Sequence, residues 1–400
     1  MPQNKNSFTK ICIVTPEYPP DQWGGLARTV KNVSLHIQNM GIAVHIAHFI
    51  FTDESIILLD ENREDELVGE IMVHRLSIGK EDFSNRSYTM WDSPYTRTFK
   101  MMYQSLELLH NAESFDLFHS FFLYPTGYIA GLTARKTGKP SIVTIVGNDI
   151  KKYIFSPEKT AMCKSGLENA DRIVALSDDL LDVADALSPV KSKGRVIYNS
   201  VEIPDKPLTA QSKSNTFRIG CAGIFKYAKG LPYLFKAIAK LRKKHNVTLE
   251  LLGTLRDSEL GTYKEMVQRT DIQDILTFHP AVHHEKLIEW LFSLNAFVLP
   301  SLSEGCPNVL MEAMACGLPC VATRVGAVEN LIEDGISGFI VPWGNANVIA
   351  DAIEQIIAMT DGGLALGNTA RERMMFFSSE RERGAWEKVY RGLIVTKTIC

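Results

Sequence analysis

The chain has 400 residues, of which 45% are hydrophobic and 22% charged, with a formal net charge of −3. This length favours two domains, and the small net charge excludes a strongly basic nucleic-acid-binding protein. The first ten residues lack the apolar centre of a secretory signal, and no apolar run approaches the ~20 residues of a membrane span. Seven scattered cysteines favour reduced thiols, so we expect a cytoplasmic protein.

Short apolar runs alternate with stretches of helical period in the N-terminal half. Residues 10–15 (KICIVT) form the first run, and Leu26, Val30, Val33 and Ile37 then repeat at helical spacing. Further strands are predicted at residues 43–50, 71–76, 115–121, 141–147, 171–177 and 195–201. The charged stretch 60–66 (DENREDE) is predicted to be a solvated loop.

The polar stretch 202–216, which carries two prolines, predicts a linker to a second series of strands and helices. Strands are expected at 217–223, 248–253, 275–281, 294–301, 319–323 and 338–342, and helices at 231–244, 284–294 and 307–316. The pattern predicts an α/β protein with two doubly wound, Rossmann-like domains facing across a cleft. The predicted parts are 1–205, 206–378 and a C-terminal helix, 379–400, that returns to the first domain.

One helix of the second series contains a glutamate in an apolar setting. In residues 303–323 (SEGCPNVLMEAMACGLPCVAT), Glu304 falls in a loop and Glu312 in the helix. Helical spacing puts Glu312 on the stripe of Asn308, away from the buried face. A diphosphate at the helix start and a sugar diol near Glu312 would fit this spacing. The alternative is that both glutamates are solvated charges.

Several motifs are missing, and their absence narrows the chemistry. No G-x-G-x-x-G follows either opening strand, and the sequence has no Walker loop, which disfavours a dinucleotide cofactor or a P-loop. No D-x-D pair is present, and the stretch HHEKL at 283–287 lacks the second histidine of a zinc-protease helix. We therefore expect no metal and no cofactor apart from a co-substrate.

The segment EGCPNVLMEAMACGLP, with two glutamates spaced E-x7-E, resembles the donor site of retaining glycosyltransferases with the GT-B fold, family GT4. Other features match the family in order along nearly the whole chain. These are Gly24-Gly25, FDLFHS with a strand-end His119, GIFKYAKG (223–230), TRVGAVENLIEDGISGFIVP (323–342) and the last helix around 385–394.

The resemblance implies a role for each matching residue. Glu312 would bind the ribose diol, Lys229 and the helix start the diphosphate, and Glu304 the donor sugar. The predicted catalytic residues are Glu304, His119 and Lys229. The predicted donor-binding residues are Gly25, Lys226, Gly305, Cys306, Pro307, Asn308, Val309, Leu310 and Glu312, with Gly24, Arg28 and Asp149 as further candidates.

The sequence departs from the family pattern at two places. Ile224 stands where the family usually has a phosphate-binding arginine, and Lys226 is predicted to replace its charge from two residues further on. In the stretch VGND (146–149), Val146 stands where the family often has histidine or arginine, whereas Gly147 and Asp149 are retained.

The resemblance implies a metal-independent, retaining glycosyltransferase of polysaccharide or glycoconjugate biosynthesis. The expected donor is a UDP- or GDP-sugar, with UDP favoured, and the expected acceptor is a saccharide or lipid-linked saccharide. Peripheral association with the inner face of the membrane and the oligomeric state stay open, and no nucleic-acid partner is expected. The alternatives are a GT-B sugar-nucleotide epimerase and a catalytically weak GT-B protein that binds a partner transferase.

Overall fold

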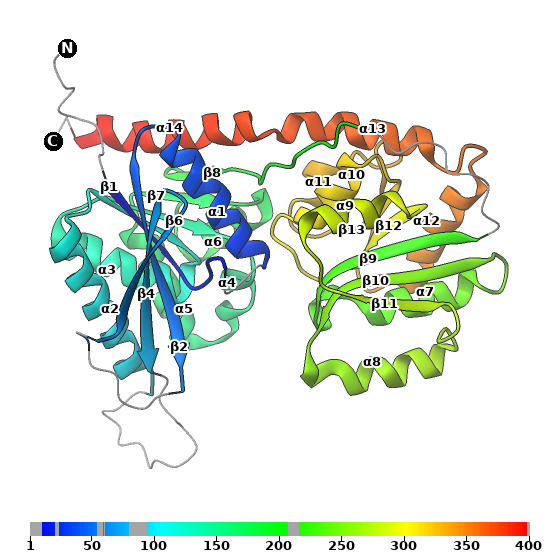
Figure 1. Cartoon of the computed structure of the whole chain (residues 1–400), viewed down its shortest axis with the longest axis horizontal. Coiled ribbons are helices and arrows are strands. Elements are labelled where there is room, and N and C mark those ends of the chain that lie inside the picture. The colour runs from blue at the N-terminus through cyan, green and yellow to red at the C-terminus, as the bar shows by residue number, and fades with distance from the viewer. Residues whose placement is uncertain are drawn as a thin grey trace. The chain divides into compact units, whose positions relative to one another are not determined.

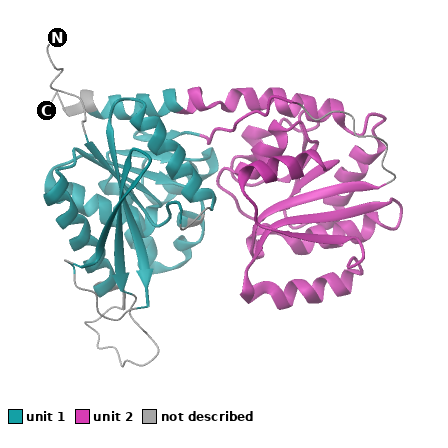
Figure 2. Ribbon diagram, viewed as in Figure 1, with its two compact units in different colours: residues 1–197, 383–400 teal, residues 198–382 magenta. Residues whose placement is uncertain are grey.

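The computed structural model describes residues 10–20, 24–53, 59, 61–79, 94–206 and 216–397 (Figure 1). The chain divides into two compact units (Figure 2). Unit 1 comprises residues 1–197 and 383–400, and unit 2 comprises residues 198–382. The first division lies eight residues before the predicted 205/206, and the second lies four residues after the predicted 378/379. Residues 207–215 of the predicted linker lie outside the described part.

Unit 1 is built on a sheet of eight strands in the order β3-β4-β2-β1-β5-β6-β7-β8. All neighbours are parallel except β3 and β4. The strands are β1 Lys10–Thr15, β2 Ala43–Thr52, β3 Arg63–Val68, β4 Ile71–Gly79, β5 Leu117–Phe121, β6 Ser141–Ile145, β7 Arg172–Ala175 and β8 Gly194–Val196.

Helices cover both faces of this sheet because its strands alternate apolar side chains between two cores (Figure 1). Ile11 and Ile13 face a core that includes Trp386 and Tyr390 of the last helix, whereas Cys12 and Val14 face the other core. The helices of this unit are α1 Gly25–Gln38, α2 Pro94–Glu113, α3 Tyr128–Thr137, α4 Asn148–Lys151, α5 Pro157–Asn169, α6 Asp178–Leu187 and most of α14 Ser379–Lys397.

Unit 2 has a parallel sheet of six strands in the order β11-β10-β9-β12-β13-β14. Its strands are β9 Phe217–Phe225, β10 Val247–Leu255, β11 Leu276–Pro280, β12 Ala296–Leu299, β13 Cys320–Thr323 and β14 Phe339–Val341. Its helices are α7 Leu231–Leu241, α8 Asp257–Thr270, α9 His284–Phe292, α10 Asn308–Ala315, α11 Val328–Leu331, α12 Ala346–Ala358 and α13 Leu364–Met374.

Both sheets confirm the predicted doubly wound α/β architecture, and every predicted strand is present. The solvated loop predicted at 60–66 is wrong in part, because Arg63 begins the edge strand β3. That strand reads REDELV and pairs antiparallel with β4, with the side chains of Glu64, Asp65 and Glu66 exposed to solvent. Charged side chains on an edge strand disfavour pairing with other chains, so a charge-rich sequence is compatible with a strand at this place.

No described helix is long and apolar enough to cross a membrane. The six cysteines among the described residues are buried and unpaired with one another. Cys400 lies outside the described residues.

Candidate donor site

Two loops of unit 2 meet at its switch point, between β9 and β12, where the order of the strands in the sheet reverses. The loop after β9 and the loop after β12 leave neighbouring strands at their carboxyl ends, the place where doubly wound folds bind ligands. Leu302 N–H donates to the carbonyl of Ala228 at 2.7 Å. Gly230 has φ +66°, and a Cβ there would lie 2.0 Å from the carbonyl oxygen of Pro300. Glycine is therefore needed at this position for the two loops to approach.

The predicted residues Lys229 and Glu304 form an ion pair across these loops. Lys229 Nζ lies 2.6 Å from Glu304 Oε1, and Ser301 Oγ donates to the same oxygen at 2.6 Å. The side chains of Lys229 and Glu304 are only 18% and 13% exposed. An ammonium group has three donors, so Lys229 has hydrogen-bonding capacity beyond Glu304 that a phosphate oxygen could use.

The backbone at Glu304 is fixed from the loop after β13. Gly326 has φ +56°, and a Cβ there would lie 2.3 Å from the carbonyl oxygen of Gly305. Ala327 N–H donates to that same oxygen at 2.8 Å. The loop that carries Glu304 is therefore held by backbone packing that no other residue type at position 326 permits without strain. The sequence contained this glycine in the matching stretch 323–342, but gave no role to it.

The helix α10 begins one residue later than predicted, with Pro307 as its N-cap. The carbonyl of Pro307 accepts from the N–H groups of Leu310 and Met311 at 3.1 and 3.3 Å. The N–H of Leu310 therefore has a partner inside the chain, and its role in donor binding stays a prediction. Asn308 and Val309 are the first two residues of the helix. Asn308 Oδ1 accepts from Asn199 Nδ2 at 2.7 Å, and sequence reasoning missed this second asparagine.

Glu312 is buried, which corrects the prediction that it lies away from the core face. Every residue of α10 from Leu310 to Ala315 is buried, because α9 and α13 pack against the helix. Only 2% of the Glu312 side chain is exposed, and its Oε1 lies 3.3 Å from Nδ1 of His284. Burying a carboxylate costs free energy unless polar groups contact it. Glu312 is therefore not the solvated helix residue of the alternative interpretation. His284 was also missed, since nothing in its spacing connects it to Glu312.

The remaining predicted positions of unit 2 lie on these two loops, on the last residues of β9 and at the start of α10. Cys306 is buried beside Met311, with its Sγ 3.6 Å from the Met311 sulfur, and burial raises the pKa of its thiol to about 12. Ile224 is 49% exposed, and the side chain of the next residue, Phe225, is buried. The backbone of Lys226 is extended. Ile224 and Lys226 therefore leave the same side of the chain, as the predicted charge replacement requires.

In unit 1, the two glycines stand at the start of α1. Gly24 is the N-cap and Gly25 the first helical residue. A Cβ on Gly24 would lie 3.1 Å from Glu17 Oε2. Arg28 is on the first turn, where its N–H donates to the carbonyl of Gly24 at 3.2 Å. Residues 21–23 of this loop lie outside the described part.

His119 is not at a strand end, and the structure does not support its predicted contact with a ligand. It is the third of five residues in β5 and has no exposed surface. Its Nδ1 lies 2.7 Å from the hydroxyl of Tyr390, and its Nε2 lies 2.7 Å from Oγ1 of Thr144. Burial lowers the pKa of His119 to about 3, so the imidazole is neutral. His119 belongs to the core beneath α14.

Asp149 also has a structural environment. It is fully buried, and its carboxylate accepts from the N–H groups of Leu123 at 2.8 Å and Gly147 at 2.7 Å. Burial raises the pKa of this carboxyl, while the backbone hydrogen bonds oppose that shift. Asp149 therefore fixes the loops that follow β5 and β6. The first of these loops begins with Phe122 at φ 76°, a strained conformation for an aromatic residue.

Two doubly wound, Rossmann-like units are the architecture of the GT-B class of glycosyltransferases. The chain belongs to the group 1 glycosyltransferases. Residues 216–359 match the family model "Glycosyl transferases group 1", and residues 23–203 match "Glycosyltransferase Family 4".

Individual proteins resemble the chain over most of its length. The N-acetyl-alpha-D-glucosaminyl L-malate synthase of Bacillus anthracis is 26% identical over 290 residues, which are 70% of this chain and 75% of that protein. The sucrose-phosphate synthase of Thermosynechococcus elongatus shares the fold with a TM-score of 0.78 and 20% identity, over 97% of this chain and 100% of that one. Anabaena Alr3699/HepE, solved with UDP-glucose, has a TM-score of 0.70 and 17% identity, over 96% and 99% of the two chains.

Proposed function

We propose that the protein transfers a sugar from a UDP- or GDP-sugar, with UDP favoured, to a hydroxyl of an acceptor, with retention at the anomeric carbon. The bond from that carbon to the diphosphate breaks, a bond to the acceptor oxygen forms, and the acceptor proton leaves with the nucleoside diphosphate. The observation that carries this proposal is the Lys229–Glu304 pair at the switch point of unit 2. The UDP-glucose complex of the HepE fold relative supports a UDP-sugar donor.

Each group of the site has a role in this proposal. Lys229 and the start of α10 take the diphosphate, because an ammonium and a helix N-terminus both stabilise the negative charge that develops on the leaving group. Glu304 binds the donor sugar and holds Lys229 in place through their shared contact. Glu312 accepts hydrogen bonds from the ribose diol. Because these groups neutralise the diphosphate, no divalent ion is required for the transfer.

The sugar-nucleotide epimerase and the weak partner protein remain the alternatives. The epimerase would also use paired carboxylates and a histidine, and the ring nitrogens of His119 both have partners inside unit 1.

A thermal-shift screen of nucleotide sugars tests the proposal, because a ligand that binds the folded state raises its melting temperature. We expect UDP-sugars to raise the melting temperature and ADP-sugars to leave it unchanged. Incubating UDP-GlcNAc without an acceptor then separates the alternatives. UDP-ManNAc would identify an epimerase, and no turnover of any donor with a panel of saccharide acceptors would identify the partner protein.

A further inference from the structure

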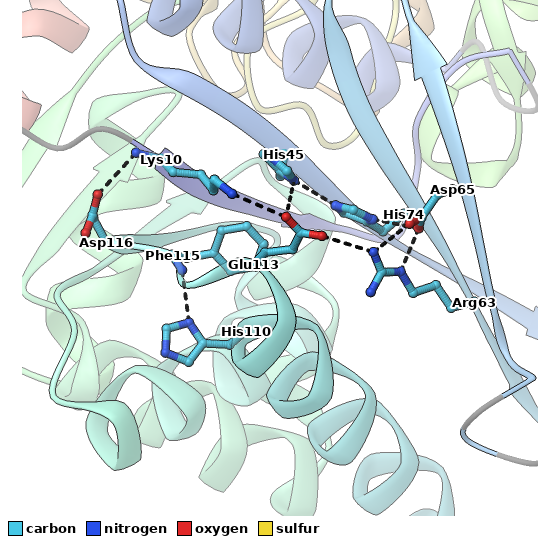
Figure 3. Close-up of polar contacts among 9 residues, drawn as sticks. All are labelled: Lys10, His45, Arg63, Asp65, His74, His110, Glu113, Phe115 and Asp116. Carbon is cyan, nitrogen blue, oxygen red and sulfur yellow. Dashed lines mark hydrogen bonds and ion pairs between the residues drawn. The ribbon is translucent and has the colours of Figure 1, made fainter.

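Two histidines and a glutamate converge at the amino ends of the strands of unit 1 (Figure 3). His45 is the third of ten residues in β2, His74 is the fourth of nine in β4, and Glu113 is the last residue of α2. His45 Nδ1, His74 Nε2 and a Glu113 carboxylate oxygen all lie within 4.8 Å of one another. We call these three residues the amino-edge cluster. It is the one such group of metal-ligating side chains that the described residues contain.

The hydrogen bonds of the cluster determine where its protons lie. His74 Nδ1 is 2.7 Å from Asp65 Oδ1, and the Arg63 guanidinium donates to both oxygens of Asp65, so this carboxylate is an acceptor. His74 therefore carries its proton on Nδ1 and keeps a lone pair on Nε2. That lone pair faces His45 Nδ1 at 2.8 Å. Moving the proton of His45 from Nδ1 to Nε2 would leave two imidazole lone pairs directed at one point.

The third donor completes a set typical of a zinc site. Glu113 Oε2 lies 3.9 Å from His45 Nδ1. Two ligand atoms bound to a tetrahedral zinc at ~2.05 Å would be about 3.3 Å apart. On zinc binding, the distance between His45 Nδ1 and His74 Nε2 would therefore widen by roughly half an ångström, and the distance between His45 Nδ1 and Glu113 Oε2 would shorten by about the same amount. Two imidazoles and one carboxylate leave a fourth position for water. This set suits zinc better than calcium or magnesium, which prefer oxygen ligands.

Residues around the cluster hold the His74 ring in place without a bound metal. The His74 side chain is 1% exposed, and Asp65 holds it from the adjacent strand β3. A carboxylate that accepts the second N–H of a ligating histidine orients the ring and increases its basicity. Arg63 in turn holds Asp65 through two guanidinium contacts.

The ammonium group of Lys10 contacts the carboxylate of the cluster, and this contact makes the hypothesis testable. Lys10 Nζ lies 3.3 Å from Glu113 Oε2, the oxygen nearest to His45, and its side chain is 33% exposed. A bound divalent ion would repel this ammonium, which has room to turn toward solvent. Arg63 contacts the other oxygen, Oε1, at 3.2 Å. Lys10 therefore competes with a metal for one carboxylate oxygen, whereas Arg63 does not.

We propose that His45, His74 and Glu113 bind one zinc-class divalent cation, with Asp65 orienting His74. The ion would join β2, β4 and α2, three segments that are far apart in the sequence. The cluster stands at the amino ends of the strands, and the glycine loop after β1 stands at the opposite, carboxyl end. The ion therefore stabilises unit 1 and takes no part in sugar transfer.

Zinc titration of the full chain tests this proposal. Protein stripped with EDTA and exchanged into chelator-free buffer is titrated with ZnCl2 by calorimetry, and the metal is counted after gel filtration. We expect one zinc per chain. His45→Gln and Glu113→Gln should each weaken binding about tenfold or more, and Asp65→Asn about 10–100-fold. Lys10→Met should strengthen binding severalfold, because it removes the competing charge.

His110→Asn is the matched control. His110 is near the cluster, but its Nδ1 accepts from the N–H of Phe115 at 3.2 Å, and an asparagine oxygen preserves that contact. Zinc affinity unchanged by His110→Asn supports the proposal. Wild-type protein that retains no zinc, or zinc that binds equally well to His45→Gln and Glu113→Gln, overturns it. Glu113→Gln alters only the end of a helix, so it keeps the test decisive if His45→Gln fails to fold, which circular dichroism reports.

Discussion

Lys229 Nζ and Glu304 Oε1 are 2.6 Å apart, although 75 residues separate them in the sequence. Each comes from a loop at the carboxyl end of one of two neighbouring strands. The ammonium is thereby held at the switch point of unit 2, and its charge is balanced before any ligand arrives. A phosphate that binds there can accept a hydrogen bond from Lys229, and the lysine side chain does not have to change its conformation.

The first prediction concerns the two lysines of the loop after β9. Lys226→Ala should lower kcat/KM about as much as Lys229→Ala, because Lys226 takes the place of the charge that Ile224 does not provide. Each should cost roughly 2–4 kcal/mol of transition-state stabilisation, the range found for removing one oxyanion-hole donor. Steady-state kinetics with the donor found by screening measures this. Exposed Lys243→Ala is the control, and an unaffected Lys226→Ala enzyme would refute the charge replacement.

Glu312 gives a prediction about binding. Glu312→Gln keeps the side-chain volume in a buried position, but removes the charge that a ribose diol would donate to. Affinity for the nucleoside diphosphate should fall by roughly 1.5–3 kcal/mol, the value of a hydrogen bond to a charged group. Isothermal calorimetry with UDP measures this, with exposed Glu289→Gln on α9 as the control. Equal affinities of the wild type and Glu312→Gln would remove Glu312 from the site.

The effect of a chelator separates the transfer chemistry from the amino-edge cluster. Turnover in EDTA should equal turnover without it at a temperature well below the melting transition, because Lys229 and the start of α10 neutralise the diphosphate. The melting temperature should fall in EDTA if zinc stabilises unit 1, and only zinc should restore it. Loss of turnover at low temperature that magnesium or manganese restores would contradict metal-independent transfer.

His119 should make stability depend on pH. Its pKa is about 3 in the folded protein and ~6.5 in the unfolded chain, so between these values the unfolded chain binds more protons. Stability therefore falls as pH decreases from about 6.5 toward 3, by ~1.4 kcal/mol per pH unit for this group. Urea unfolding of the wild type and His119→Gln between pH 7 and 4 measures the slope, which should be smaller in the variant. Exposed His283→Gln should keep the wild-type slope.

The same His119→Gln protein tests the catalytic role that the sequence suggested. If His119 belongs only to the core, kcat/KM measured at a temperature where the variant stays folded should change little. A decrease of several hundredfold in a folded variant would restore His119 to the site and contradict its placement beneath α14.

The sequence predicted the strands and the Lys229–Glu304 loops well, because apolar runs and glycines act locally. It failed where the burial or the contacts of a residue depend on other elements of the fold. Helical spacing identified the stripe of Glu312 but could not show that α9 and α13 pack around α10. The end of the strand at residue 121 was predicted correctly, but the family resemblance placed His119 at the strand end, whereas it is the third of the five residues of β5. The amino-edge cluster has no sequence signature, because strand pairing alone brings His45 and His74 together.

A crystal structure of the protein with UDP-glucose is the most direct test of the proposed donor site. We expect the diphosphate within hydrogen-bonding distance of Lys229 Nζ and the start of α10, with the ribose diol on Glu312 and the glucose beside Glu304. A nucleotide bound elsewhere in unit 2, or a diphosphate that makes no contact with Lys229 and α10, would contradict the site proposed for sugar transfer.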